Sequence, residues 1–321
     1  MSLADTLPAL ALADIQAARA RIAGKVNVTP VMTSHVLDEA AGVSLFFKCE
    51  NFQKAGAFKA RGAANAVFKL TSEAAARGVA THSSGNHAAA LARAAGLRGI
   101  AAHIVMPSNV SKPKAESVAR YGGQIVYCEP TLAAREAMVA KVVAETGAVL
   151  IHPYDNLDVM AGAGTAAVEL MEQAPDLDAV IAPIGGGGLI SGTAVAVKSL
   201  SAKTRVVGVE PASADDAARS VAAGRLIPAG DPVTIADGLR ASLSPQTFAL
   251  IRTYVDQIVA VSEAEIIEAM RAIWSVMKII VEPSSAVPYA AIRAGRIDVR
   301  GQRVGIILTG GNLDLDKLPW A

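Results

Sequence analysis

The sequence predicts an α/β protein with two doubly wound, parallel-sheet domains, and three observations support this fold class. Short aliphatic runs alternate with longer alanine-rich amphipathic stretches, which is the pattern of repeated strand–helix units. The 321 residues provide room for about two domains of ordinary size. Hydrophobic residues make up 52% of the chain but aromatic residues only 4%, so the core must consist of aliphatic side chains and alanine.

The predicted elements follow one another in the order that such a fold requires. Strands are predicted at residues 45–49, 79–82, 101–105, 124–127, 149–151, 179–184, 205–210, 258–261 and 304–308. Helices are predicted between them at residues 58–70, 87–95, 112–121, 132–146, 163–173, 190–200 and 263–278. No obvious linker divides the chain, so we expect it to cross between the two domains more than once.

Composition excludes several classes of protein. The formal net charge is +1, with 30 basic and 29 acidic residues, which argues against a nucleic-acid or anionic-membrane partner. Two cysteines, Cys49 and Cys128, are too few for a disulfide framework or a thiolate zinc site. The start of the chain lacks the basic region of a signal peptide. Residues 179–197 carry no charge, but Pro183 and four glycines interrupt them, so we expect a cytoplasmic protein without a membrane span.

A glycine loop, Gly185-Gly186-Gly187-Gly188, lies between a predicted strand and a predicted helix. Backbone N–H groups of such a loop converge on a phosphate, assisted by the N-terminus of the helix. No Lys-Ser/Thr pair follows, so the loop is not a Walker motif, and a simple tight turn is the alternative. A second glycine pattern, at residues 162–167, is interpreted as close helix packing.

Two further segments combine polar residues with the start of a helix. Lys59 follows Phe58 at the opening of an apolar helix, where a desolvated amine can form a Schiff base; the alternative is an ordinary lysine whose charged end reaches solvent. Residues 81–88, Thr-His-Ser-Ser-Gly-Asn-His-Ala, place hydroxyl groups and helix-start amides where a carboxylate can bind. Simple capping of the helix is the alternative, and no G-x-S-x-G elbow supports a hydrolase.

The last two segments follow later strands. Residues 309–312, Thr-Gly-Gly-Asn, come directly after the final predicted strand. Residues 210–216, Glu-Pro-Ala-Ser-Ala-Asp-Asp, supply carboxylates and free carbonyls suited to a hard cation such as Mg²⁺ or Ca²⁺. For an isolated acidic loop, a solvated surface turn is the alternative.

Taken singly these motifs are weak, but their joint order resembles the fold-type II pyridoxal 5′-phosphate (PLP) enzymes. The chain is most similar to the branch that contains serine racemase, threonine dehydratase and hydroxyaspartate dehydratase, over residues of about 18 to 315. The resemblance implies a tryptophan synthase β-like fold with the cofactor between two domains. It implies a large PLP-binding domain of residues 1–75 and 154–321, and a small substrate-binding domain of residues 76–153.

The resemblance also implies how the cofactor is held. Lys59 would carry PLP as a Schiff base and act as acid and base on one face of Cα, with Phe58 against the cofactor ring. Asn86 would bind the phenolic oxygen, and Thr309 would face the pyridine nitrogen. A hydroxyl cannot keep that nitrogen protonated as a carboxylate would, so the ring is a weaker electron sink, which suits loss of a β-substituent. The phosphate would lie on the four loop residues Gly185, Gly186, Gly187 and Gly188.

Substrate and metal residues follow from the same resemblance. The substrate α-carboxylate would bind the group Ser83, Ser84, Asn86 and His87, and Ser84 would act as acid and base on the opposite face of Cα. A divalent cation, Mg²⁺ or else Mn²⁺ or Ca²⁺, would bind the group Glu210, Ala214 (through its carbonyl) and Asp216. The sequence departs from the animal serine racemases after His-Pro, where Tyr154 stands in place of asparagine.

The choice of substrate depends on two residues, Arg135 and Ser242. If Arg135 reaches the site rather than the surface, a bidentate pair with a β-carboxylate favours 3-hydroxyaspartate over serine, with Ser242 on the opposite wall. We therefore expect dehydration of a β-hydroxy amino acid, preferably 3-hydroxyaspartate, by a homodimer. Serine racemase is the alternative activity, and a cofactor-binding sensor is the alternative class. Because the chain ends soon after residue 312, no regulatory domain like that of biosynthetic threonine dehydratases is expected.

Overall fold

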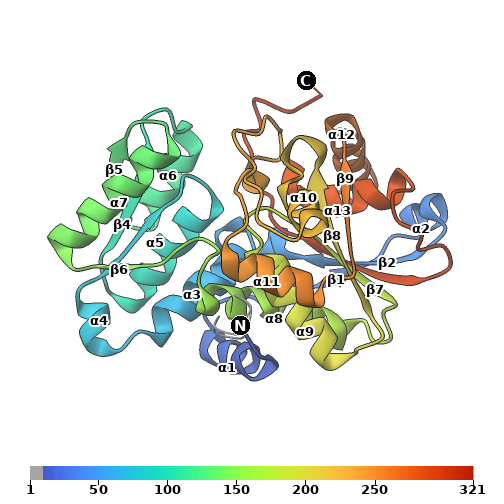
Figure 1. Ribbon diagram of the computed structural model, residues 1–321, viewed down its shortest axis with the longest axis horizontal. Coiled ribbons are helices and arrows are strands. Elements are labelled where there is room, and N and C mark those ends of the chain that lie inside the picture. The colour runs from blue at the N-terminus through green and yellow to red at the C-terminus, as the bar shows by residue number, and fades with distance from the viewer. Residues whose placement is uncertain (1–9, 321) are drawn as a thin grey trace.

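Two parallel sheets organise the computed structural model, which describes residues 10–320 (Figure 1). The larger sheet has six strands, of which only the β1–β2 pair is antiparallel. Its order is β1 (Val31–Met32), β2 (Ser44–Cys49), β10 (Arg303–Leu308), β7 (Ala179–Pro183), β8 (Arg205–Pro211) and β9 (Gln257–Val261). The smaller sheet has four parallel strands in the order β5 (Gln124–Cys128), β4 (Ala102–Pro107), β3 (Val79–His82) and β6 (Val149–Leu150).

Every predicted strand is present, and the two-sheet prediction is confirmed. The strand that the sequence did not reveal is β1, whose two residues are too short for a period-two pattern. The four strands of the smaller sheet all lie within the predicted small domain of residues 76–153. The boundaries of that domain remain a prediction, because side chains of α3 (Lys59–Lys69) also pack into the core beside the smaller sheet.

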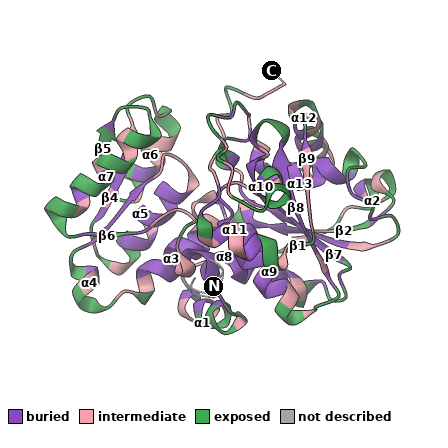
Figure 2. Ribbon diagram, in the orientation of Figure 1, coloured by how far each residue is buried: buried purple, intermediate pink, exposed green. Residues whose placement is uncertain are grey.

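Helices cover both faces of each sheet, as a doubly wound fold requires. On the larger sheet, alternate residues of one strand face different cores: Ile181 packs with α13 (Pro283–Arg293), and Val180 packs with α8 (Leu157–Gln173) and α9 (Gly188–Leu200). On the smaller sheet α5 (Asn86–Arg98) covers one face and α7 (Leu132–Thr146) the other. The purple strands, α8 and α9 in Figure 2 mark the buried interior, whereas α4 and α7 are largely exposed.

Some helices have bounds that differ from the predicted ones, and others were not predicted. The helix predicted at 163–173 begins earlier, at Leu157, and the one predicted at 263–278 is α12 (Glu263–Ala272) followed by a π-helical turn to Met277. Pro288 lies inside α13, which hides that helix from a sequence pattern. The remaining helices are α1 (Leu12–Ile22), α2 (His35–Ala41), α4 (Ser72–Ala76), α6 (Lys112–Arg120), α10 (Asp216–Ala223) and α11 (Pro245–Tyr254).

Glycines bring α3, α8 and α9 into close contact, as predicted for residues 162–167. A Cβ atom on Gly162 would lie 2.6 Å from the carbonyl oxygen of Arg61, and one on Gly164 would lie 2.7 Å from that of Gly192. The uncharged stretch 179–197 forms β7, the glycine loop and most of α9. None of the helices in the described residues has the length and apolar character needed to cross a bilayer. Cys49 and Cys128 are both buried free thiols.

A buried ionic cluster, consisting of Lys48, Glu50, Arg61 and Glu169, fixes the start of α3. The Arg61 guanidinium donates to both carboxylates, with Nε–Oε2 of Glu50 at 2.7 Å and Nη1–Oε1 of Glu169 at 2.7 Å. Lys48 Nζ also donates to Glu169, at 2.7 Å. Two positive and two negative charges therefore compensate one another inside the protein. The cluster joins β2, α3 and α8, and its member Arg61 lies two residues after Lys59.

Candidate active site

Both sheets place their strand ends so that one site can form between them. In the larger sheet the chain runs outward from β7 through β8 to β9, then returns to β10 on the other side of β7. In the smaller sheet it runs from β3 through β4 to β5, then returns to β6 on the other side of β3. Ligands of α/β proteins bind at the carboxyl ends of strands where the order reverses in this way. The segments that leave these four strands are the glycine loop, Thr309, the Ser83–Asn86 turn and residues 151–154.

Lys59 opens α3 with its amine directed to the second of these reversal points. Its Nζ donates to the carbonyl oxygen of Pro153 at 2.7 Å and lies 5.1 Å from the centroid of the Phe58 ring. Burial lowers the pKa of the Lys59 amine to about 8, and the nearby carboxylate of Glu282 opposes this shift. The Lys59 side chain is half-buried, and a backbone carbonyl holds its amine.

The glycine loop connects β7 to α9 through a conformation that requires glycine. Gly187 has a φ of 87° and caps the N-terminus of α9, so the first N–H groups of a 13-residue helix are available at the loop. The ring of Tyr154 lies directly on the loop, because a Cβ atom on Gly186 would be 2.5 Å from three of its carbon atoms. Gly185 is equally enclosed, since its Cβ would lie 3.0 Å from the carbonyl oxygen of Gly238.

Asn86, the first residue of α5, has its side-chain amide held on both sides. Its Nδ2 donates to the carboxylate of Glu282, at 2.8 Å and 3.1 Å from the two oxygens. Its Oδ1 accepts a hydrogen bond of 2.9 Å from Nδ2 of Asn312. The direction of the amide is thereby determined, with its nitrogen toward Glu282 and its oxygen toward Asn312.

Thr309, at the carboxyl end of β10, belongs to a pair of buried hydroxyl groups. Its Oγ1 lies 3.1 Å from Oγ of Ser285, and either oxygen can be the donor. Ser285 Oγ is also 2.8 Å from the carbonyl oxygen of Gly310 and 2.7 Å from its backbone nitrogen. A neutral hydroxyl therefore occupies the position that the resemblance assigns to the partner of the pyridine nitrogen.

The turn between β3 and α5 carries the predicted carboxylate-binding residues. Ser83 Oγ accepts a long hydrogen bond of 3.4 Å from the backbone N–H of Gly85, while Ser84 is half-buried. His87 is buried, with Nε2 at 3.2 Å from the carbonyl oxygen of Ile151, and its Nδ1 has no partner among the described residues. Burial, followed by the charge of Lys59, lowers the pKa of His87 to about 3, so the ring is neutral at physiological pH.

Arg135 and Ser242 have different surroundings. Arg135 lies half-buried near the start of α7, with Nε at 3.4 Å from the carbonyl oxygen of Thr131. Burial and then the charge of Arg135 lower the pKa of His82, the last residue of β3. Ser242 Oγ accepts a hydrogen bond of 2.9 Å from the backbone N–H of Ala229, so the contact it makes here is structural.

Glu210, in β8, and Asp216, the first residue of α10, are both buried, so the alternative of a solvated surface turn is wrong for these two carboxylates. The Glu210 carboxylate accepts the backbone N–H groups of Ala217 and Ala218, each at 2.9 Å. Burial raises the pKa of Glu210 to about 8, and the charges of Asp216 and Asp215 add to this shift. Burial also raises the pKa of Asp216 to about 6, with a contribution from Asp215. Neither forms a salt bridge within residues 10–320.

The donor set at this segment suits a hard cation, although it is small. Two buried carboxylates and the carbonyl of Ala214 are oxygen ligands of the kind that Mg²⁺ and Ca²⁺ prefer. Over the described part of the chain, no cluster of three or more His, Cys, Asp or Glu side chains has the arrangement of a metal site. Water would therefore have to complete the coordination of a bound cation.

Three site residues were given no role from the sequence. Glu282 precedes α13 and Asn312 follows β10, yet both contact Asn86, from positions 196 and 226 residues away. His152 packs edge-on against His82, with ring centroids 5.2 Å apart. Because a carboxylate before a proline is an ordinary helix start, the sequence carried no sign of the contact that Glu282 makes.

The residues at the strand ends fit PLP. The glycine loop offers helix-start N–H groups for a phosphate, Lys59 offers an amine with a lowered pKa, and Thr309 offers a neutral hydroxyl. His87 adds a buried nitrogen with no partner among residues 10–320, which is costly unless a ligand group satisfies it. When bound, PLP withdraws electrons from the Cα atom of an amino acid and so makes its proton removable.

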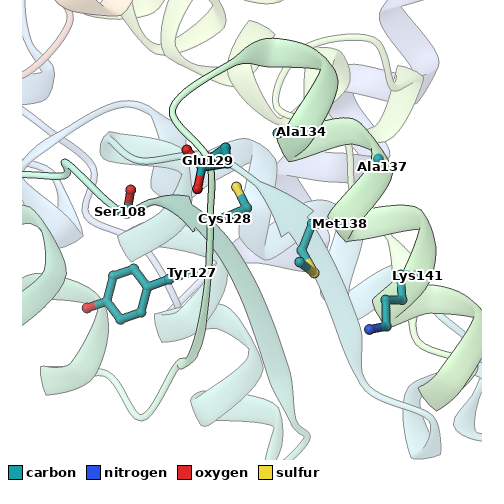
Figure 3. Close-up of a pocket in the computed structure, with 8 residues that line it drawn as sticks. All are labelled: Ser108, Tyr127, Cys128, Glu129, Ala134, Ala137, Met138 and Lys141. Carbon is teal, nitrogen blue, oxygen red and sulfur yellow. The ribbon is translucent and has the colours of Figure 1, made fainter.

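An open groove on the smaller sheet, of about 570 Å³, lies apart from these residues (Figure 3). It is bordered by the end of β5 and by α7, with Tyr127, Cys128 and Lys141 among its lining residues. It contains none of the predicted site residues, so it does not compete with the strand ends as the candidate site.

Comparison with known proteins agrees with this geometry. Residues 22–310 match the family described as pyridoxal-phosphate dependent enzyme. The chain is 53% identical over 307 residues to a beta-hydroxyaspartate dehydratase of Paracoccus denitrificans (strain Pd 1222), covering 96% of this chain and 98% of that protein. It is 49% identical to the serine racemase of Arabidopsis thaliana, over 95% of this chain and 93% of that protein. The structure of maize serine racemase superposes with a TM-score of 0.94 at 47% identity, covering 96% of this chain and 95% of that chain.

Proposed function

Because the chain belongs to the pyridoxal-phosphate dependent enzyme family, we propose that it dehydrates a β-hydroxy amino acid, 3-hydroxyaspartate in preference to serine or threonine. The reaction removes the Cα proton and the β-hydroxyl group as one molecule of water. From 3-hydroxyaspartate it yields iminosuccinate, which hydrolyses to oxaloacetate and ammonia. The observation that carries the proposal is the convergence of Lys59, the glycine loop, Asn86 and Thr309 at the reversal points of the two sheets.

The residues around the reacting atoms have separate tasks in this proposal. Lys59 would hold the cofactor covalently, and its amine would take the proton from one face of Cα. An amine pKa of about 8 leaves a useful neutral fraction at pH 7. Ser84 stands on the opposite face as a second acid and base. Phe58 borders the cofactor ring, and Asn86 donates to its phenolic oxygen. The phosphate is held by Gly185, Gly186, Gly187 and Gly188.

Thr309 determines the kind of reaction. Its hydroxyl, which lies 3.1 Å from that of Ser285, would face the pyridine nitrogen without supplying the charge that would keep that nitrogen protonated. Prolonged negative charge at Cα is then poorly stabilised, so rapid expulsion of a β-leaving group is favoured.

The substrate is held at two ends. The α-carboxylate binds at the start of α5, where hydroxyl groups and helix-start N–H groups attract an anion. A β-carboxylate binds Arg135, whose planar fork makes a bidentate pair, with Ser242 on the other wall. The residues proposed for the α-carboxylate are Ser83, Ser84, Asn86 and His87.

We further propose that Mg²⁺, or else Mn²⁺ or Ca²⁺, binds Glu210, the carbonyl of Ala214 and Asp216, outside the proton chemistry. The two carboxylates support this, because they are buried without a salt bridge to any residue that the structure describes, and a cation would compensate their charge. Dialysis against a chelator should lower the thermal unfolding midpoint of the holoenzyme, and Mg²⁺ should restore it. A Glu210→Gln variant should lose that response, and an identical response in the variant would contradict the site.

Three organisational proposals accompany the activity. The large domain comprises residues 1–75 and 154–321, and the small domain residues 76–153, with PLP between them. The enzyme is a homodimer in the cytoplasm that acts on a free amino acid, without nucleic-acid or membrane partners. Sedimentation of the purified holoenzyme tests the dimer.

The activity is tested by steady-state kinetics of the holoenzyme on 3-hydroxyaspartate stereoisomers, serine and threonine. We expect the highest kcat/KM on a 3-hydroxyaspartate isomer, and an Arg135→Ala variant should lose that preference. Highest activity on threonine, unaffected by Arg135→Ala, would refute the preference. Loss of the visible absorption band of lysine-bound cofactor in Lys59→Ala, together with turnover by the parent, would eliminate a non-catalytic sensor.

Serine racemase activity is the second candidate, favoured by 49% identity to the plant enzyme. In this reading Ser84 would be the acid and base on the face of Cα opposite Lys59. Chiral analysis of the serine that remains after incubation with L-serine separates the two activities. Substantial D-serine, abolished in Ser84→Ala, would favour racemisation.

A further inference from the structure

Tyr154 lies against the glycine loop, next to the residue whose carbonyl oxygen binds the Lys59 amine. It follows β6 in a turn whose backbone is fixed on both sides. Nδ1 of His152 accepts a hydrogen bond of 2.9 Å from the backbone N–H of Asp155, and the carbonyl oxygen of Pro153 accepts the amine of Lys59 at 2.7 Å. Tyr154 therefore has a fixed position next to the residue that carries the cofactor.

Packing also fixes the ring of Tyr154. A Cβ atom on Gly186 would lie 2.5 Å from three ring carbons, and one on Gly188 would lie 2.9 Å from Cβ of Tyr154. The ring of His152 meets it edge-on, with centroids 4.6 Å apart and planes at 84°. The hydroxyl group at the far end of the ring is thus held by a rigid support, which is the requirement for a precise ligand contact.

The hydroxyl group itself is available. It forms no hydrogen bond with any residue between 10 and 320, and the side chain is only half-buried. Burial, with contributions from the carboxylates of Asp155, Asp216 and Glu136, raises its pKa to about 12, and Arg135 opposes this shift. The phenol accordingly stays protonated at any working pH and remains a hydrogen-bond donor.

We propose that Tyr154 determines substrate specificity by donating its hydroxyl hydrogen bond to the second carboxylate of the substrate, beside Arg135. A carboxylate accepts more hydrogen bonds than one guanidinium fork supplies, so a neutral donor satisfies an oxygen that Arg135 leaves free. Serine has no second carboxylate and gains nothing from this contact. The inference rests on the proposed function and adds the residue that, with Arg135, distinguishes a dicarboxylic substrate from serine.

Kinetics of the Tyr154→Phe holoenzyme test the specificity. This variant keeps the ring on the glycine loop and removes only the hydroxyl. We expect kcat/KM for 3-hydroxyaspartate to fall about tenfold and that for L-serine to change less than about twofold, the effect of one hydrogen bond to a charged group. Tyr127→Phe, at an exposed tyrosine in the groove of Figure 3, is the matched control and should change neither value.

A binding experiment separates this inference from the proposed function. Holoenzyme is titrated calorimetrically with succinate, a dicarboxylate that lacks the reacting groups, and with butyrate, its monocarboxylate counterpart. Tyr154→Phe should weaken succinate about tenfold and leave butyrate unchanged. Equal changes for both ligands, no change, or loss of PLP from the variant would overturn the role of Tyr154. A parent enzyme that dehydrates no β-hydroxy amino acid would refute the proposed function, while the two titrations would still decide about Tyr154.

Discussion

Replacing Arg61 by methionine should lower the free energy of unfolding by about 3–5 kcal/mol, the usual cost of breaking a buried ion pair by removing one partner. The side chain of Arg61 is fully buried, as are those of its partners apart from a few per cent of Glu169. Its guanidinium makes two hydrogen bonds to Glu50, at 2.7 Å and 2.8 Å, and two to Glu169, also at 2.7 Å and 2.8 Å. Methionine keeps much of the volume but supplies no donor.

The size of this loss comes from what the substitution leaves behind. Glu169 retains Lys48 as a partner, at 2.7 Å, whereas Glu50 retains only the hydroxyl of Thr29 and a long contact of 3.4 Å to Gln53. A buried carboxylate without a cation must take up a proton or admit water, and either costs free energy. Removing the stranded charge should therefore restore part of the stability, and we expect Arg61→Met/Glu50→Gln to be more stable than Arg61→Met alone.

Urea-induced unfolding followed by circular dichroism measures these differences. The control is Arg19→Met, which removes a bidentate pair with Glu172 at the surface, where the side chains are 41% and 53% exposed. That control should lose less than about 1 kcal/mol. A loss below about 1 kcal/mol for Arg61→Met, or no recovery in the double variant, would refute the argument that the cluster is held by charge compensation.

Three further predictions concern the site. The rate at which the apoprotein attaches PLP should rise with pH around a midpoint near 8, because about a tenth of Lys59 is neutral at pH 7, against about one in three thousand for a lysine of pKa 10.5. Burial and then the charge of Asp237 raise the pKa of Glu282 to about 7, so the folded state keeps a proton that the unfolded state loses. The free energy of unfolding of the apoprotein should therefore fall as the pH rises from about 4.5 to 7. The Glu282→Gln variant should lack that part of the decline. Gly186→Ala should cost about 1–3 kcal/mol of unfolding free energy, because its Cβ would overlap the ring of Tyr154.

Each of these predictions has a result that contradicts it. A midpoint above pH 10 for attachment would mean that the Lys59 amine is not desolvated. A pH profile of stability that is identical in Glu282→Gln would mean that another group titrates. For Gly186→Ala, a Tyr154→Ala background removes the ring and should abolish most of the loss; an unchanged loss would place the strain elsewhere.

The strands were predictable because each is a short apolar run bounded by polar or glycine residues, a local pattern that does not depend on distant partners. The glycine loop and the start of α3 were recognisable for the same reason, since a strand–glycine–helix sequence implies available N–H groups. The helix α13 was not predicted, because Pro288 argues locally against a helix that packing on four strands of the sheet stabilises.

The network around Asn86 could not have been derived from local patterns. Its partners Glu282 and Asn312 are joined to it only through the folding of two sheets against each other. The burial of Glu210 and Asp216 likewise contradicted the local pattern, in which an acidic loop with proline and serine indicates solvent exposure.

The sequence by itself determined the fold class, the strand ends that carry chemistry and the resemblance to PLP enzymes, because periodicity and short motifs are properties of neighbouring residues. Only the tertiary structure decided which groups meet: that the Lys59 amine is desolvated beside Pro153, that Tyr154 lies on the glycine loop, and that four charges compensate one another beneath α3. Burial and long-range contact change the pKa values and hydrogen-bond partners of these groups, and both are properties of the assembled fold.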